Sequence, residues 1–170
     1  EEVEKSHKIE LKMMEQFRRT EAMTRIVSLL DSDGPIQEIM ARAMELTGVY
    51  LDVSNAFLVH MRKTDKRIDI IDQWSVEGGE DIFSRTNEIE RYCFLKDDKP
   101  YVISSDTRCS SAECRQMEQL GIRAVAVMPI IIGQEVAFYA CLAETRHERV
   151  FKVDDVKFLS DAIKILQSII

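Results

Sequence analysis

The sequence lacks any apolar run close to the roughly 20 residues that a membrane-spanning helix needs. Its first residues, mostly glutamate, do not resemble a secretory signal. Cations are outnumbered as well, because 23 Lys and Arg stand against 30 Asp and Glu, for a net charge of -7. Nucleic acids and anionic membranes both attract clustered cations. We therefore expect a cytoplasmic segment, excised from a longer chain, that binds neither nucleic acid nor membrane.

Glycine, cysteine and histidine are scarce too, with six, four and three residues in a chain of 170. So few glycines argue against a loop that cradles phosphates, and the dispersed histidines argue against a catalytic or metal cluster. Without a secretory signal, four unevenly spaced cysteines are expected to be free thiols. Cys109 and Cys114 leave a redox pair open, but no second cysteine pair accompanies them to complete a metal site.

Apolar residues make up 45% of the chain, which is enough for one domain with its own core. Residues 1–30 contain neither Gly nor Pro, and their apolar side chains recur at steps of three or four among charges. This spacing predicts a long amphipathic helix, which we interpret as a connector or dimerisation helix. Turn formers at 31–35 end it, and a second helix is expected to reach about residue 48. We take 31–170 as the domain proper.

Apolar and β-branched runs bounded by turn residues predict two hairpins and one short strand. The first hairpin pairs 55–61 with 67–74 across a polar turn, and the second pairs 123–131 with 135–143. A brief strand is expected at 101–104, directly after a proline.

Helices are expected between and after these strands. Short ones are predicted at 87–95 and 111–120, and a last helix begins at 153, so that 154–170 would lead toward an output domain. Its apolar residues follow the a/d spacing of a coiled coil, over too few heptads to establish one. They are Val156, Leu159, Ile163, Leu166 and Ile170.

This order of elements, with four short motifs, resembles the GAF domain, a regulatory module of phosphodiesterases, phytochromes and many bacterial signalling proteins. Residues 99–106 look like the family's "g-x-P-hydrophobic-x-x-D" passage, and 121–130 look like its "G-hydrophobic-R-S" strand. Residues 135–138 are similar to the strand that follows in the family, and 149–155 to the "r-x-F-x-x-x-D" start of the last helix. The resemblance covers about residues 20–170.

The resemblance implies an α+β fold: a central antiparallel sheet of about six strands, with the N- and C-terminal helices on one face and short helices roofing a small-molecule pocket on the other. It also implies a homodimer joined through the terminal helices. The domain would perform no chemistry and would regulate a covalently linked output domain missing from this chain. A bacterial diguanylate cyclase, histidine kinase or transcriptional activator would be such a protein. The ligand and any cofactor stay unknown.

Departures from the family's motifs disfavour two of its ligand classes. The cyclic-nucleotide signature ends in a glutamate where this chain has Val156. Bilin-binding relatives attach their chromophore to a cysteine, but Arg91 stands where the motif around Cys93 has an aspartate. Cys109 and Cys114 also lack the neighbouring histidine.

The family's geometry draws the pocket lining from the second strand, the insert helices and the central strands. Alternation places Ile68, Ile70, Asp72 and Trp74 on one face of the second strand. An aromatic ring to stack on a ligand and a charged group to fix it are usual in such sites. The candidate ligand-binding residues are Trp74, Tyr92, Cys93, Asp106, Arg123 and Tyr139.

Two other functions remain open. A ligand-free GAF domain would serve only as a dimerisation and spacing element, with its cavity filled by its own Phe, Met and Tyr side chains. A thiol-dependent reductase of the free methionine sulfoxide type would use cysteines, although the family's glycine-rich cysteine segment has no match here.

Overall fold

The computed structural model describes residues 1–65, 67–85, 95, 98–106 and 111–170. The chain begins with α1 (Glu2–Ser28), continues through a short 3-10 turn (Leu29–Asp31), and then forms α2 (Ile36–Leu51). Asp52 adopts the left-handed conformation, with φ 52°, and ends α2. The two predicted helices are confirmed.

Five strands form one antiparallel sheet in the order β2-β1-β5-β4-β3. About six strands were expected, so the sheet has the predicted character with one strand fewer among the described residues. Both predicted hairpins and the short strand are present. Their bounds are β1 (Asn55–Met61), β2 (Ile68–Ser75), β3 (Tyr101–Ile103), β4 (Ala124–Ile132) and β5 (Glu135–Glu144).

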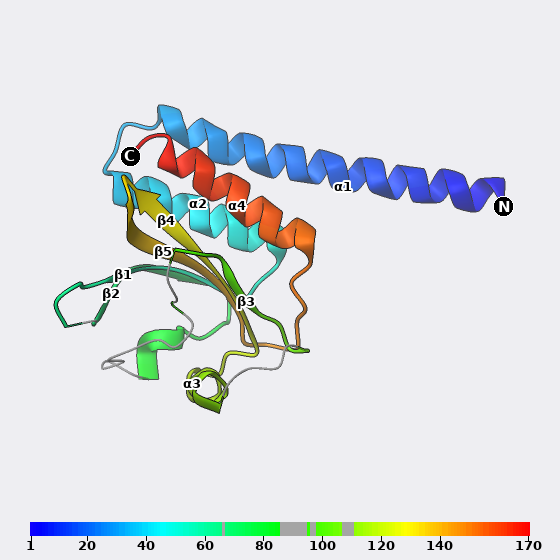
Figure 1. Cartoon of the computed structure of the whole chain (residues 1–170). Coiled ribbons are helices and arrows are strands. Elements are labelled where there is room, and N and C mark those ends of the chain that lie inside the picture. Colours follow the sequence, from blue (N-terminus) through cyan, green and yellow to red (C-terminus); the bar gives the residue numbers. More distant parts are fainter. Residues whose placement is uncertain (66, 86–94, 96–97, 107–110) are drawn as a thin grey trace.

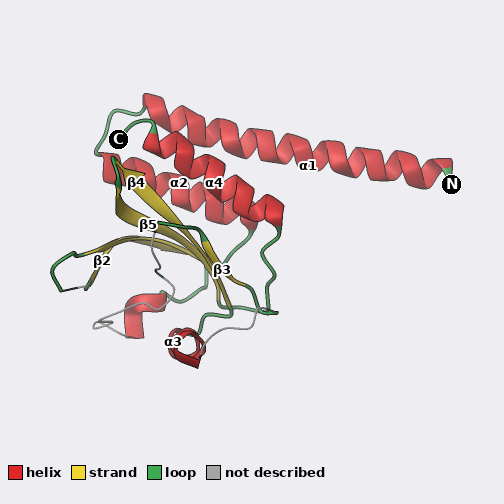
Figure 2. Ribbon diagram, in the orientation of Figure 1, coloured by secondary structure: helices red, strands yellow, loops and turns green. Residues whose placement is uncertain are grey.

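The sheet is covered on both faces (Figure 1). Helices α1, α2 and α4 (Val153–Gln167) lie on one side, whereas α3 (Ser111–Leu120) and the 3-10 helix η2 (Ile82–Arg85) lie on the other (Figure 2). Two apolar clusters follow from this layering. The helix-side core includes Leu58, Leu142 and Phe158. The roof-side core includes Phe57, Val125, Met117 and Tyr139.

The predicted short helix at 111–120 is confirmed as α3. The one expected at 87–95 lies outside the described residues except for Leu95, which belongs to the roof-side core.

A β-bulge in β2 overturns the predicted alternation of that strand. Leu58 pairs with Asp72 while the next residue, Val59, pairs with Ile70, so Ile71 is an extra residue in β2. One extra residue exchanges the faces of everything beyond it. Ile68 therefore packs against the roof-side core and Trp74 against the helix-side core. The prediction that both share one face was wrong.

The a/d spacing of the last helix serves the domain's own core. Leu159, Ile163 and Leu166 are all at most 3% exposed and belong to the helix-side core. Val156 packs against the same core, and only Ile170 is exposed. This stripe therefore faces the sheet and α2 and is not available as a coiled-coil seam.

Replacing Gly48 should test the contact between α2 and Trp74. A Cβ at Gly48 would lie 2.8 Å from the Trp74 ring, so valine there must displace the indole. We expect Gly48→Val to lower the free energy of unfolding by about 1–3 kcal/mol in urea denaturation, as overpacking does. Gly34→Val is the matched control, because the nearest side-chain atom there is 3.8 Å away. Equal stability of the two variants would contradict the contact.

Candidate functional site

The predicted site residues fall on different parts of the fold. Tyr139 is buried in the roof-side core, and Trp74 lies on the opposite face of the sheet against Gly48. Arg123 and Asp106 are exposed. Ser105 links them, because it precedes Asp106 in the chain and its hydroxyl donates a hydrogen bond to the Arg123 carbonyl at 3.2 Å. Tyr92 and Cys93 lie outside the described residues.

Aromatic rings and a buried thiol fill the roof-side face of the central strands. The rings of Phe57 and Phe83 meet edge to face at 5.0 Å between centroids. Cys141 is fully buried beside them in the roof-side core, and burial raises the pKa of its thiol well above the ordinary value. A thiol held neutral in this way is a poor nucleophile.

Cys114, in α3, is exposed and forms a disulfide bond, which corrects the expectation of free thiols at this position. Spacing in sequence does not show which cysteines the fold brings within bonding distance. The partner cysteine lies outside the described residues. In the part of the chain that the structure describes, no three His, Cys, Asp or Glu side chains converge as metal ligands would.

A groove of about 600 Å³ opens between α3 and the end of β3, and we call it the α3 groove. Its floor contains Ile103, Met117 and Ile122, which are buried members of the roof-side core. Its rim is polar. The remaining lining residues are Ser104, Ser105, Cys114, Glu118, Gly121, Arg123 and Thr145.

The chain between β5 and α4, residues 145–152, connects the rim of this groove to the last helix. The backbone N–H of Arg149 donates to the Ser105 hydroxyl at 2.7 Å, and the N–H of Ser105 donates to the Arg149 carbonyl at 2.8 Å. The N–H of Phe151 donates to the Ser104 hydroxyl at 2.9 Å. The Arg149 guanidinium lies 3.8 Å from Asp155 in the first turn of α4. This β5–α4 segment therefore bonds to both layers.

A buried carboxylate anchors the start of the same segment. Glu144 is 0% exposed, and its oxygens accept hydrogen bonds from the Arg146 guanidinium at 2.9 and 3.1 Å. Burial alone would raise the pKa of Glu144, but the bonds from Arg146 outweigh it and lower the pKa below its ordinary value. Nε2 of His147 lies 3.3 Å from the same carboxylate, and Arg146 also reaches Asp52 at the end of α2.

Neither this cluster nor the serines at the rim of the α3 groove were among the residues predicted from sequence. The available signal was Glu144 itself, an acidic residue that follows the apolar run 136–143 and precedes Arg146 by two positions.

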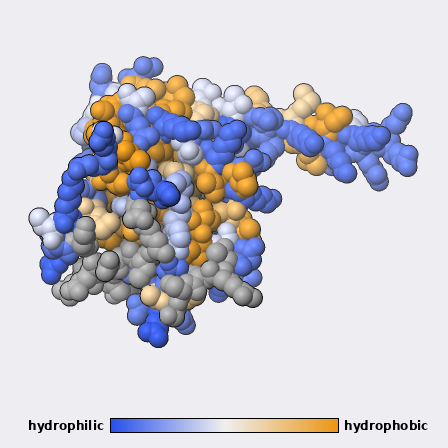
Figure 3. All heavy atoms as spheres, viewed as in Figure 1, coloured by the Kyte–Doolittle hydropathy of each residue, from blue (hydrophilic) through white to orange (hydrophobic). Residues whose placement is uncertain are grey.

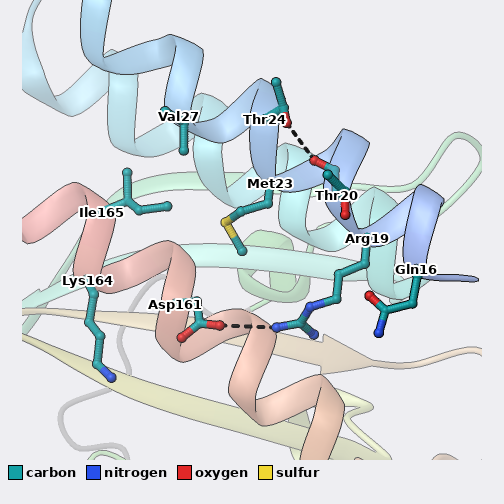
Figure 4. Close-up of a pocket in the computed structure, with 9 residues that line it drawn as sticks. All are labelled: Gln16, Arg19, Thr20, Met23, Thr24, Val27, Asp161, Lys164 and Ile165. Carbon is teal, nitrogen blue, oxygen red and sulfur yellow. Dashed lines mark hydrogen bonds and ion pairs between the residues drawn. The ribbon is translucent and has the colours of Figure 1, made fainter.

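A second groove, of about 570 Å³, lies between α1 and α4, and we call it the terminal-helix groove. Its α1 wall is formed by Gln16, Arg19, Thr20, Met23, Thr24 and Val27, and its α4 wall by Asp161, Lys164 and Ile165. Arg19 bridges the walls through an ion pair of 3.1 Å with Asp161 (Figure 4). Val27, Met23 and Ile165 supply apolar surface above that bridge.

The N-terminal half of α1 projects beyond the domain (Figure 1), and apolar atoms appear there among hydrophilic ones (Figure 3). Ile9 is 58% exposed and Met13 is 67% exposed. These two residues precede Gln16, Thr20 and Thr24 by helical steps of three or four, so all five lie on one face of α1. The wall of the terminal-helix groove thus continues along the projecting helix as an apolar face.

The family model of the GAF domain matches residues 35–169, and the chain belongs to this family. Solved structures agree. The phycoerythrobilin-bound GAF domain of a cyanobacterial phytochrome has 12% sequence identity and a TM-score of 0.70, with 91% of this chain and 95% of that chain covered. The GAF domain of cyanobacteriochrome TePixJ has 11% identity and a TM-score of 0.68, with 83% and 91% covered.

A third similar structure is the GAF domain of a protein described as a sensor histidine kinase of Pseudomonas syringae pv. tomato. Its identity is 10% and its TM-score is 0.64, with 94% of this chain and 89% of that chain covered. The comparison with curated proteins gave no match. At these identities the likeness to solved structures establishes the fold. Within the described residues, no helix combines the length and the apolar content that crossing a membrane requires.

Replacing Arg146 with methionine should leave Glu144 buried without its main partner. We expect a loss of about 1–3 kcal/mol in the free energy of unfolding near pH 7. In the natural chain the lowered pKa means that the stabilisation by Glu144 is lost as pH falls through its folded pKa. In the variant, burial raises that pKa, so the penalty shrinks on acidification.

The stability difference between the two proteins should therefore be smaller near pH 4 than near pH 7, as measured by urea denaturation. Arg62→Met is the control, because Arg62 pairs with Asp69 where both side chains are exposed, and its loss should cost under about 0.5 kcal/mol at either pH. A difference that grows on acidification would contradict the assignment.

Proposed function

We propose that this chain is the regulatory sensor of a larger cytoplasmic bacterial signalling protein, such as a diguanylate cyclase, a histidine kinase or a transcriptional activator. It binds a small molecule on the roof side of the sheet and performs no chemistry. It relays occupancy through terminal helices paired in a homodimer. Residues 1–30 act as the connector, and 154–170 lead to the covalently linked output domain.

The observation that carries the proposal is the apolar face of α1. Ile9 and Met13 project beyond the domain, where the described part of this chain does not cover them. The same face forms one wall of the terminal-helix groove. A second copy that aligned its own α1 here would bury both stretches together. The a/d residues of α4 are packed in the domain's own core and cannot contact a second copy. The dimer contact is therefore supplied by α1 and by the outer side of α4.

To relay a signal, the domain must have two conformations, and the ligand must bind one of them more tightly than the other. The contacts of the β5–α4 segment support such a relay, because its residues bond to Ser104 and Ser105 on the roof side and to Asp155 in α4. Of the residues predicted to bind ligand, Asp106, Arg123 and Tyr139 remain candidates for this site. Tyr92 and Cys93 also stay predictions, and they lie outside the described residues. Trp74 packs on the helix side and is not included.

The spacer alternative has one observation in its favour, the packing of Phe57 against Phe83 over the roof-side face. The reductase alternative finds no nucleophile in Cys141, because that thiol is buried with a raised pKa. The Cys114 disulfide does not count against it, since a thiol-dependent reductase forms such a bond at each turnover.

Charge on the apolar face of α1 should separate the dimer. We expect the natural chain to sediment as a dimer at micromolar concentration, and Ile9→Glu with Met13→Glu to weaken association at least about ten-fold through repulsion of like charges. Leu11→Glu is the control, since Leu11 is 52% exposed but lies two residues from each site and faces away from them. Dimers that tolerate the double change, or a monomeric natural chain, would refute the relay.

Native mass spectra of the freshly purified chain should separate the sensor from its alternatives. We expect a dimer with a co-purified small molecule that is absent from denatured spectra. An empty dimer that captures nothing from a cell extract of small metabolites would favour the spacer. Turnover of added free methionine sulfoxide, lost on Cys114→Ser, would favour the reductase.

A further inference from the structure

We propose that the α3 groove binds a small organic carboxylate, and that the β5–α4 segment transmits its occupancy to α4. This inference rests on the proposed function and names the ligand class and the site of that sensor.

The shape of the groove suits a small molecule with an apolar body. Its volume of about 600 Å³ is within the usual range for small-molecule sites. Ile103, Met117 and Ile122 are 2%, 6% and 4% exposed, so they form a floor that the core already holds in place. A ligand there would gain apolar contact without a rearrangement of the core.

Two unpaired charges define the polar end of the ligand. Arg123 and Glu118 both line the groove, and in the described structure neither side chain has an ion-pair or hydrogen-bond partner. The backbone of Arg123 is fixed, because its N–H donates to the Glu144 carbonyl at 2.7 Å. A guanidinium that lines a groove with an apolar floor favours a planar carboxylate. Glu118 disfavours a second negative charge and can accept a hydrogen bond from a hydroxyl or amine of the ligand.

The rim of the groove shares its hydrogen bonds with the β5–α4 segment. The Ser105 hydroxyl donates to the Arg123 carbonyl and accepts from the Arg149 N–H, so it joins the binding residue to that segment. Arg149 in turn approaches Asp155 in α4. A ligand that draws Arg123 toward the groove therefore pulls on the residues that begin the last helix.

The test uses 2-hydroxy-4-methylpentanoate, which combines a carboxylate, a hydroxyl donor and an apolar body. Titration into the whole isotope-labelled chain should give saturable amide shifts at Ser105 and Arg123 with a millimolar dissociation constant. Its uncharged methyl ester should give none. Arg123→Gln should weaken binding by about ten-fold or more. Arg115→Gln, which removes an exposed cation of α3 outside the groove, should weaken it less than about two-fold.

Transmission has its own variants. Amides 149–155 should shift with the same dissociation constant in the natural chain. Arg149→Gln, outside the groove lining, removes the ion pair with Asp155. It should preserve binding within about two-fold and at least halve those distant shifts, while Arg149→Lys, which keeps the charge, should restore them.

No saturable shift up to about 20 mM, or equal weakening by the two arginine variants, would overturn the site. Unchanged distant shifts in Arg149→Gln would overturn the transmission. Sedimentation of the same sample separates the two failures, since a dimer without binding defeats only this inference, and binding by a monomer defeats only the dimeric relay.

Discussion

The central strands of the sheet are apolar on both faces. The rest of the structure follows from the need to cover each of these faces with helices. Along β1, Leu58 points to the helix-side core and Val59 to the roof-side core, and β5 repeats the pattern with Leu142 and Cys141. Removing both faces from water is the main favourable term in folding. Helices α2 and α4 pack their apolar sides against one face of the sheet, and α3 and η2 cover the other.

Among the described elements, α1 has the most large apolar side chains left exposed. Its C-terminal part contributes Ile26 to the helix-side core, whereas Ile9 and Met13 belong to neither core and are mostly exposed. The two covers are also separated by the thickness of the sheet, so a signal must pass the ends of the strands. The β5–α4 segment leaves the end of β5 and is bonded to Ser105, just beyond β3, and to Asp155 in α4.

Periodicity and turn residues predicted nearly every described helix and strand, because each depends on local pattern. The face of Trp74 could not be predicted, since one extra residue at Ile71 reverses the alternation without any glycine or proline to mark it. The partner of the apolar stripe on α4 could not be predicted either, because a/d spacing suits packing against another helix and against a sheet equally. The site depends on contacts between distant residues, such as Ser105 with Arg149, for which a single sequence holds no signal.

The strand order also has a consequence for how the chain folds. The β1–β2 and β4–β5 hairpins are local, but β1 must pair with β5, and Asn55 meets Ala143 across more than half of the domain's sequence. Loop-closure entropy makes such a pairing late and slow. During synthesis the first hairpin therefore emerges with both apolar faces and an open edge exposed until the second leaves the ribosome. That interval is when this protein is most prone to aggregation and most in need of a chaperone.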